Sequence, residues 1–363
     1  MEQRAVEAVI NADASDLLTL TEALVAVNSV SGNEGPLCDA VAQRLAKNAP
    51  HLTVERIGNS LVARTASGHS RRLILGGHFD TVPPNENAIA CREGETLYGL
   101  GSADMKGSLA VMLALAEQAS DLACDLTFLF YECEEVEEER NGLRKILEVQ
   151  PSLLAGDLAI LMEPTDGWVE AGCQGTLHVK ATYRGARAHS ARPWTGRNAI
   201  HELSAALTQV VEASSHLAPR TVDGMVFTQA LQVVAIDGGI ANNVVPDEAS
   251  ITVNRRFAPD VSPEDALEQT KTLFKDADAI EVLNLSPGAL PGLQQDAVAA
   301  FVDRAGGKVR SKLGWTDVAR FTSVGVPALN FGAGDPLLAH TREECVTRAS
   351  LAAVHEVLRK QIT

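Results

Sequence analysis

Residues 72–80 read Arg-Leu-Ile-Leu-Gly-Gly-His-Phe-Asp, an apolar strand that leads into a histidine and an acid and gives the first indication of the fold. Two later apolar segments also lead into acidic residues. They are Leu126–Phe130, followed by Glu134 and Glu135, and Leu158–Leu161, followed by Glu163. Parallel α/β sheets gather their functional groups at the carboxyl ends of the strands. With Asp104 from a glycine-rich loop and His340 late in the chain, the pattern predicts a dinuclear metal site with a nearby base.

Size and composition indicate a globular protein with more than one domain. The chain has 363 residues, which is too many for one ordinary core and suggests two domains. Hydrophobic residues make up 45% and charged residues 21%, as in soluble proteins. The sequence has no apolar run of the ~20 residues that a membrane span needs. Residues 1–16 lack the basic and apolar regions of a signal peptide, so we expect no membrane partner and a cytoplasmic location.

Charge and cysteine usage exclude two further classes. The formal net charge is −16, whereas nucleic-acid binding requires a basic face, so we expect no nucleic-acid partner. The six cysteines are scattered and form no C-x-x-C motif. A disulfide framework or a thiolate zinc site is therefore not expected, and the cysteines are interpreted as free thiols.

Helices and strands alternate in the first part of the chain. Apolar residues at helical spacing predict helices over 16–27, 37–47 and 108–118, and a further helix from about residue 142. Strands are predicted over 52–56, 61–65, 72–76, 126–131 and 158–162. This order is typical of an α/β domain with a mixed, largely parallel, buried sheet flanked by helices.

A different pattern begins at residue 177. Strands over 177–183, 227–236, 250–257 and 279–285 and helices over 198–212 and 263–274 give the order β-α-β-β-α-β, with Ser262 as an N-cap. That order is the split βαβ arrangement of ferredoxin-like domains. Segments at 295–305, 318–324, 327–331 and 348–360 then return to the first pattern. We therefore predict a catalytic domain of residues 1–176 and 288–363 and an inserted α+β domain of residues 177–287.

No candidate ligand is convincing alone. A histidine such as His78 at a strand end is more often a polar core or loop residue, although Asp80 could fix its tautomer. Asp104 could be a simple helix N-cap, and its glycine loop lacks the third glycine of a dinucleotide motif and the Ser or Thr of a P-loop. Glu134 and Glu135 lie in an acidic run that suits a solvated helix start.

Glu163 could likewise be an ordinary strand-exit carboxylate, and His340 alone is weak. Together the residues form a set of imidazoles and carboxylates without cysteine. Such a set suits zinc, manganese or cobalt in an open, catalytic site.

Seven motifs together resemble the dinuclear-zinc amidohydrolase and exopeptidase family, which includes aminoacylases and bacterial carboxypeptidases. They are H-x-D at 78–80, G-x-x-D-M-K-G at 101–107, E-E at 134–135, E-P-T at 163–165, G-x-x-A-H-S at 185–190, N-N-V-V-P-D-E at 242–248 and A-H at 339–340. The resemblance runs from about Asn28 to Val346, nearly the whole chain. It implies a zinc-exopeptidase fold whose inserted domain serves as lid and dimerisation domain.

The resemblance also implies a role for each matching residue. Asp104 would bridge two Zn²⁺ ions, for which Co²⁺ or Mn²⁺ could substitute. His78 and Glu163 would hold one ion, and Glu135 and His340 the other. Glu134 would be the general base, Asp80 would orient His78, and His189 would stabilise the tetrahedral intermediate, in dimeric relatives from the partner subunit. Relatives tend to carry a cis peptide after the bridging Asp. Two positions depart from the pattern: Cys133 stands where many relatives have Asp, and Met162 where many have Gly.

The distribution of cationic residues narrows the class of substrate that we expect. Residues 177–197 contain five cations and no acid, which in so acidic a chain suggests an anionic ligand or an acidic partner surface, and Arg255 and Arg256 add two more cations. At least half of these cations could simply be solvated. By resemblance, Arg256, Asn242 and Asn243 would contact a small anionic acylated amino acid.

Residues 163–176 and 314–320 look most like the actinobacterial succinyl-diaminopimelate desuccinylases. This likeness predicts cleavage of N-succinyl-LL-2,6-diaminopimelate to succinate and LL-2,6-diaminopimelate, in lysine and diaminopimelate biosynthesis, by a homodimer. The alternatives are an acetylornithine deacetylase or dipeptidase of the same family, a non-catalytic binding protein on the same fold, and a nucleotide-binding enzyme that rests on the glycine loop alone.

Overall fold

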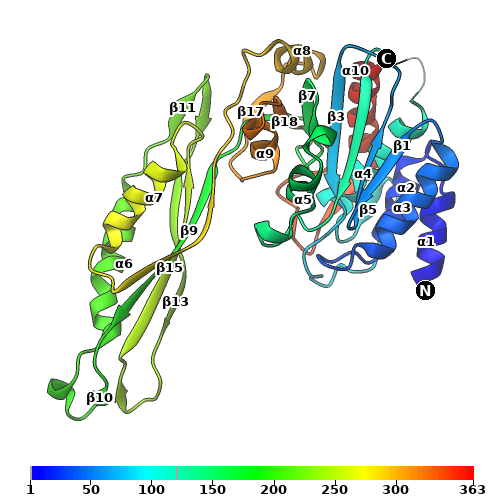
Figure 1. Ribbon diagram of the computed structural model, residues 1–363. Coiled ribbons are helices and arrows are strands. Elements are labelled where there is room, and N and C mark those ends of the chain that lie inside the picture. The colour runs from blue at the N-terminus through cyan, green and yellow to red at the C-terminus, as the bar shows by residue number, and fades with distance from the viewer. Residues whose placement is uncertain (1, 120–121) are drawn as a thin grey trace. The chain divides into compact units, whose positions relative to one another are not determined.

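The protein, seen in a computed structural model that describes residues 2–119 and 122–363, divides into two compact units (Figure 1). The large unit comprises Met1–Ala171, Gly292–Arg310 and Arg320–Thr363. The small unit comprises Gly172–Pro291 and Ser311–Ala319. The insertion predicted at 177–287 lies within the small unit, which also recruits nine residues from the later part of the chain. Each unit has a hydrophobic core of its own.

An eight-stranded sheet forms the centre of the large unit. Its order is β1 (Thr53–Ile57), β2 (Ser60–Arg64), β6 (Asp125–Tyr131), β3 (Arg72–His78), β7 (Leu158–Leu161), β18 (Ala328–Asn330), β8 (Val169–Ala171) and β17 (Val309–Ser311). The four central strands, β6, β3, β7 and β18, are parallel, whereas the pairings of β1 with β2, β2 with β6 and β18 with β8 are antiparallel. The predicted mixed α/β fold is confirmed.

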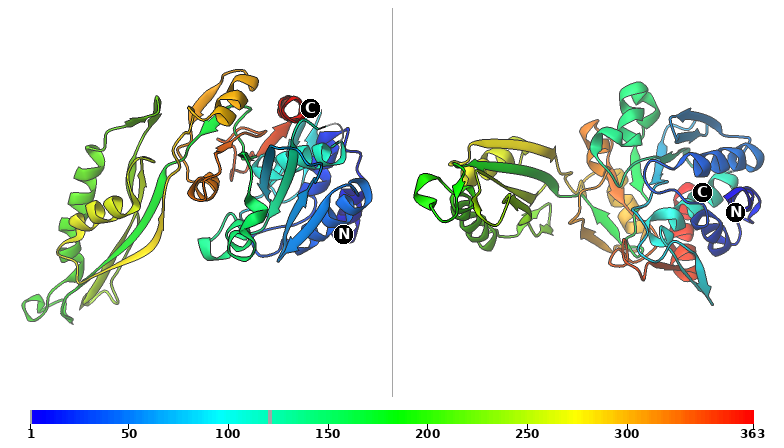
Figure 2. Two further views of the ribbon diagram at one scale, coloured as in Figure 1. Left: turned by 45° about the horizontal axis from the view of Figure 1, so that its top comes forward. Right: turned by 90° about the horizontal axis from the view of Figure 1, so that it is seen from below.

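Helices cover this sheet on both sides (Figure 2). The helices of this unit are α1 (Glu2–Asn11), α2 (Leu17–Val25), α3 (Gly35–Asn48), α4 (Gly107–Glu117), α5 (Gly142–Val149), α8 (Asp296–Arg304) and α10 (Arg348–Ile362), and α9 (Val318–Ser323) begins in the last residues assigned to the small unit. Residues 107–116 of α4 are all buried, which explains why this helix is apolar on every side. Among the described helices, none is long and apolar enough to cross a membrane.

Two features of the large unit were not predicted from the sequence. Helix α1 precedes the first predicted helix, and its C-terminal carbonyls at Val9 and Ala12 accept hydrogen bonds from buried Arg44. A three-stranded sheet joins β19 (Cys345–Thr347) to β5 (Thr96–Tyr98) and β4 (Cys91–Glu93). This small sheet places the segment after His340 beside the loop that leads to Asp104.

Gly332 allows an unusually close approach of two backbones just after β18. A Cβ atom at this position would lie 2.3 Å from the carbonyl oxygen of Met162 and 2.4 Å from that of Glu163. The Thr165 hydroxyl donates to the Gly332 carbonyl at 3.2 Å and accepts from its N–H at 3.1 Å. Glycine is therefore required for the strand end to pack against the Glu163 turn.

The small unit is a ferredoxin-like α+β fold, as predicted. Its antiparallel sheet has the order β13 (Ala230–Gly238), β15 (Glu248–Phe257), β9 (Gly175–Arg184) and β16 (Ala279–Ser286). Helices α6 (Ala199–Ser215) and α7 (Pro263–Lys271) pack on it, and the Ser262 hydroxyl caps α7 by accepting the Asp265 N–H at 3.0 Å. Two short ribbons pair β10 (Ala188–His189) with β14 (Val244–Val245), and β11 (Arg220–Val222) with β12 (Met225–Phe227).

Candidate metal centre

The register of the parallel strands brings the predicted ligands to one edge of the sheet. In the pairing of β3 with β6, His78 lies opposite Tyr131, and in the pairing of β3 with β7, Gly76 lies opposite Leu161. The chain therefore leaves three neighbouring strands at nearly the same height. The side chains at and just after these strand ends therefore lie close together at the carboxyl edge of the sheet, as expected for a parallel α/β sheet.

Asp104 lies between two histidines. Its Oδ1 is 3.2 Å from His78 Nε2, and its Oδ2 is 3.3 Å from His340 Nε2. It sits in the irregular turn Ser102–Lys106, after Gly101 in the left-handed conformation, and the Asp104–Met105 peptide is cis. Each carboxylate oxygen thus faces a different imidazole, which is the arrangement that a ligand shared by two ions requires.

Two groups of possible ligands share Asp104. His78, Asp104 and Glu163 offer ligand atoms within 4.8 Å of one another, and so do Asp104, Glu135 and His340. His340 Nε2 is 2.8 Å from Glu135 Oε1. A third, overlapping group, within the same distance, contains Glu134. The structure therefore brings together all five ligands proposed from the sequence and the proposed base.

The donor set fits two divalent cations. Hydrogen bonds to Asp104 and Glu135 raise the pKa of His340 to about 10. Burial lowers the pKa of His78, but hydrogen bonds to Asp104 and Asp80 outweigh it and raise this pKa well above its usual value. Clustered carboxylates therefore hold positive charge on both imidazoles. A cation bound by Nε2 and the carboxylates would supply the same charge in place of the protons.

Asp80 organises the loop that carries the glutamates. Its backbone carbonyl is 2.9 Å from His78 Nδ1, closer than its carboxylate at 3.5 Å, so the carbonyl is the nearer partner that orients the ring. The carboxylate accepts the N–H groups of Glu134 at 2.9 Å and Glu135 at 3.0 Å, and the Ser31 hydroxyl at 2.7 Å. Asp80 thus supports the candidate ligand His78 and the predicted base together.

Glu344 is a supporting residue that the sequence did not reveal. Its buried Oε1 accepts the backbone N–H groups of Ala103 and Asp104, both at 3.0 Å. Burial raises the pKa of Glu344 to about 7, against the opposite effect of these hydrogen bonds. Glu344 therefore fixes the turn that carries the candidate ligand Asp104, from a position four residues after His340. No local pattern marks it, since it is 240 residues from Asp104.

Lys106 does not serve as a phosphate ligand. Its side chain is buried, its Nζ donates to the Val27 carbonyl at 2.8 Å, and burial lowers its pKa to about 7. The glycine loop therefore supplies a packed lysine and the candidate metal ligand Asp104, and nothing in this geometry favours a nucleotide.

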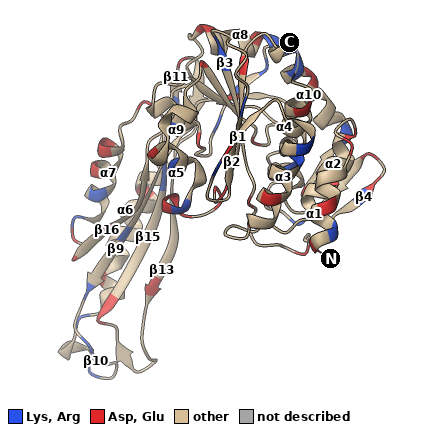
Figure 3. Cartoon of the chain, turned by 45° about the vertical axis from the view of Figure 1, so that its right-hand side comes forward, with Lys and Arg blue, Asp and Glu red and all other residues tan. Residues whose placement is uncertain are grey.

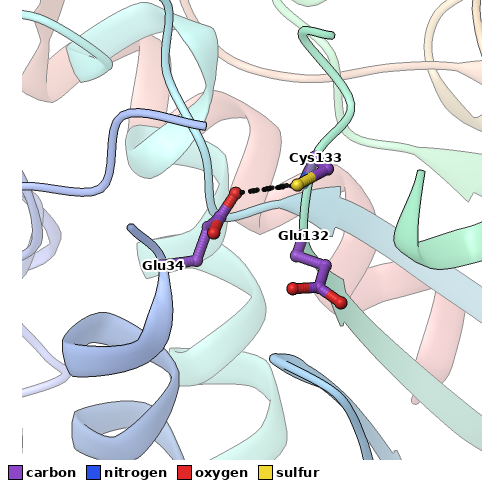
Figure 4. Close-up of side chains that lie close together, drawn as sticks. All are labelled: Glu34, Glu132 and Cys133. Carbon is purple, nitrogen blue, oxygen red and sulfur yellow. Dashed lines mark hydrogen bonds between the residues drawn. The ribbon is translucent and has the colours of Figure 1, made fainter. Parts of the chain in front are cut away.

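Cys133 and Glu34 form a buried pair behind the glutamates (Figure 4). The Cys133 thiol donates to Glu34 Oε1 at 3.3 Å, and the Cys133 N–H donates to the same oxygen at 3.2 Å. Burial raises the pKa of Cys133 to about 12, and the hydrogen bond to Glu34 acts in the same direction. The thiol is therefore neutral at physiological pH.

The remaining predicted residues lie in the small unit. The Ala191 N–H donates to His189 Nδ1 at 3.0 Å, so a neutral His189 ring carries its proton on Nε2, and this side chain is exposed. The Ser190 N–H donates to the Asn243 carbonyl at 2.9 Å, which places the segment of Asn242 and Asn243 beside His189. Arg256 is half-buried opposite Thr176 in β9, and burial lowers its pKa.

The predicted reversal of charge in residues 177–197 is smaller than expected. Arg184, at the end of β9, lies 3.7 Å from Glu248, at the start of β15, and Arg187 lies 3.0 Å from Asp247. Figure 3 shows acidic and basic residues interspersed in this part of the small unit. Arg255 is buried and donates to the Ala266 carbonyl in α7, so it does not add to a ligand site. These acids come from a distant part of the chain that a local count does not include.

A centre of histidines and carboxylates, at the carboxyl edge of a mixed α/β sheet and with a glutamate beside it, defines a metal-dependent amide hydrolase. Residues 74–363 match Peptidase family M20/M25/M40, and the chain belongs to this family.

Curated relatives are similar over almost their whole length. A Mycobacterium tuberculosis protein that is provisionally named succinyl-diaminopimelate desuccinylase DapE is 44% identical over 348 residues, covering 96% of this chain and 98% of the relative. A Corynebacterium glutamicum succinyl-diaminopimelate desuccinylase is 43% identical over 357 residues, covering 96% of each.

Solved structures share the fold at low identity. A Staphylococcus aureus tripeptidase has a TM-score of 0.75 at 22% identity, covering 95% of this chain and 96% of the other. The Bacillus subtilis YXEP protein, a dinuclear metal-binding peptidase of the M20 family, has a TM-score of 0.69 at 14% identity, with the same coverage. These likenesses support the fold alone.

Proposed function

We propose that the protein hydrolyses N-succinyl-LL-2,6-diaminopimelate to succinate and LL-2,6-diaminopimelate, in lysine and diaminopimelate biosynthesis. The observation that carries this substrate is the 43% identity to the Corynebacterium desuccinylase over 96% of both chains. The geometry supports the chemistry, because ligands for two ions surround a glutamate that could move a proton. A cytoplasmic location is part of this proposal.

His78 and Glu163 would hold one Zn²⁺ ion, Glu135 and His340 the other, with Asp104 shared between them. Co²⁺ or Mn²⁺ would serve in the same donor set. Bound there, the ions would lower the pKa of a water molecule toward ~7 and polarise the substrate carbonyl. Asp80 would keep His78 and the glutamate loop in place through the contacts described above.

Glu134 would act as general base and then as general acid. It takes a proton from the attacking water, whose oxygen forms the new bond to the acyl carbon, and gives that proton to the amine as the C–N bond breaks. His189 would donate its Nε2–H to the developing oxyanion, as the Ala191 contact to Nδ1 allows. Arg256 would bind a substrate carboxylate and Asn242 and Asn243 its backbone.

The small unit would serve as a lid and as the contact between two subunits of a homodimer, with residues 177–287 as the inserted domain and residues 1–176 and 288–363 as the catalytic domain. Its ferredoxin-like sheet has open edges at β13 and β16. Exposed apolar side chains on these strands, such as Ile236 and Leu283, support an interface there.

A side-by-side assay with added zinc tests this function. We expect succinyl-diaminopimelate to be hydrolysed at least about tenfold faster, by kcat/KM, than acetylornithine or a simple dipeptide, because it offers additional carboxylates, including that of the succinyl group, to Arg256 and the other cations of the small unit. A preference for either competitor would reassign the substrate within the family. Absence of hydrolysis of all three substrates by the zinc-loaded protein would favour the alternative, a non-catalytic binding protein on the same fold.

A further inference from the structure

One oxygen atom fixes both the backbone and the side chain of Cys133. Glu34 Oε1 accepts the N–H and the thiol of this residue, although the two residues are 99 positions apart (Figure 4). Cys133 is 3% exposed and Glu34 is fully buried. In this buried environment a carboxylate acceptor strengthens both hydrogen bonds.

The backbone at Cys133 needs such support. Its φ is 57°, in the left-handed region that residues with a Cβ atom rarely occupy. This conformation turns the chain after β6, so that the next two N–H groups, of Glu134 and Glu135, point to the Asp80 carboxylate. The direction in which Glu134 leaves the sheet thus depends on the conformation of Cys133.

Glu34 is itself held by the turn before α3. Its Oε1 also accepts the Gly32 N–H at 2.8 Å. In the same turn the Ser31 hydroxyl donates to Asp80 Oδ2 at 2.7 Å. The turn of residues 31–34 is therefore tied to the glutamate loop at two points, through Glu34 to Cys133 and through Ser31 to Asp80.

We propose that Cys133, held by Glu34, is a positioning residue for the general base Glu134. The thiol contributes by donating its hydrogen to Glu34 Oε1, which keeps the Cys133 backbone in the conformation that aims Glu134 at the metal centre. This inference rests on the proposed function, in which Glu134 carries the proton.

A third metal site is the competing interpretation of the same residues. Glu34, Glu132 and Cys133 offer ligand atoms within 4.8 Å of one another. However, Glu132 Oε1 is 3.0 Å from Lys145 Nζ, and the thiol proton is directed at Glu34. Because Lys145 pairs with Glu132 and three hydrogen-bond donors already converge on Glu34 Oε1, the contacts support a structural hydrogen bond rather than a cation.

The test compares Cys133→Ala with Cys133→Ser in the zinc-loaded full chain. Ala removes the donor and keeps the Cβ atom, whereas the Ser hydroxyl can donate in its place. We expect kcat to fall roughly 10- to 100-fold in Cys133→Ala, with KM and bound zinc unchanged, because small misplacement of a catalytic group has effects of this order. In Cys133→Ser we expect kcat to stay within about threefold of the parent. Glu34→Gln keeps an acceptor oxygen but removes its charge, and should lower kcat about three- to tenfold.

Three results would overturn the inference. They are an unchanged kcat in Cys133→Ala, an equal loss in the Ser and Ala variants, and three zinc ions per chain that fall to two in Cys133→Ala. Glu134→Gln, measured beside them, separates this inference from the proposed function. If Glu134→Gln is inactive and Cys133→Ala is fully active, only the positioning role fails; if Glu134→Gln is fully active, the assignment of the base fails.

Discussion

The two halves of the metal centre differ in depth. His78 is 1% exposed and Glu163 6%, and both follow central strands of the sheet. In the other half, the His340 side chain is 48% exposed and belongs to a loop, with a left-handed φ of 63°. Asp104 belongs to both halves. The Glu135 side chain is only 11% exposed, so the difference in depth lies between His78 and His340, the two imidazoles that the Asp104 carboxylate contacts.

Glu134→Gln tests whether proton transfer can be removed while both halves of the centre still bind their ions. Gln has the size of Glu but cannot take a proton, so kcat should fall by roughly 10²–10⁴. Zinc analysis should still find two ions per chain, because no ligand is removed. Near-parental turnover would remove Glu134 from the role of base.

Replacing each of the two histidines separately by alanine tests the difference in depth directly. His78→Ala leaves buried Asp80 without its cationic partner in the metal-free protein and leaves Asp104 with His340 alone, and we expect a loss of about 3 kcal/mol in the free energy of unfolding. His340→Ala removes a half-exposed group and should cost under about 1 kcal/mol. Urea unfolding measures both.

Zinc analysis of the same two variants is the control, since each should lose one ion. Equal destabilisation would contradict the distinction between a core half and a solvent half.

A change at Glu344 should affect both halves alike. Glu344→Ala leaves the buried N–H groups of Ala103 and Asp104 without their acceptor, which should destabilise the protein by about 1–3 kcal/mol. Because Asp104 is shared, zinc affinity should fall for both ions by a similar factor, roughly 10- to 100-fold. Calorimetric titration with zinc measures the two affinities, and selective weakening of one ion would show that Asp104 is not shared.

The smallest effect concerns pH in the metal-free protein. The folded-state pKa of His340 is raised to about 10. Its stabilising contribution is therefore complete below its unfolded value of about 6.5 and is lost as pH rises from there through about 10. Because the His340 side chain is half exposed, its contribution to the free energy of unfolding is limited to about 1 kcal/mol or less.

His340→Gln provides the reference. The difference in Tm between the metal-free parent and this variant should shrink as pH rises from 6 to 10. A difference that grows over this range would contradict the charged state assigned to His340.

Much of this centre could be predicted because it follows local patterns. Apolar strands that end in His78, Glu134, Glu135 and Glu163 indicated both the sheet and its edge. The parts that could not be predicted depend on contacts between distant segments. Glu344 reaches Asp104 across 240 residues, and the acids that neutralise Arg184 and Arg187 lie about 60 residues further along.

Cys133 illustrates a second reason. Cysteine is not a turn-forming residue, so nothing in its identity indicated a left-handed backbone. Its conformation depends on Glu34, whose role in turn depends on the packing of α3 beside the glutamate loop. The three-stranded sheet of β4, β5 and β19 was missed similarly, since strands of three residues carry too little periodicity.

Gly332 sets a steric limit on natural variation at this position, which is independent of the charges and of the chemistry of the metal centre. The nearest atoms to a new side chain there are carbonyl oxygens of Met162 and Glu163, which cannot rotate away as the tip of a side chain could. Even one added methyl group would have to push the Glu163 turn outward. Homologous enzymes that keep every ligand but replace this glycine would therefore be expected to have drifted toward mononuclear or inactive forms.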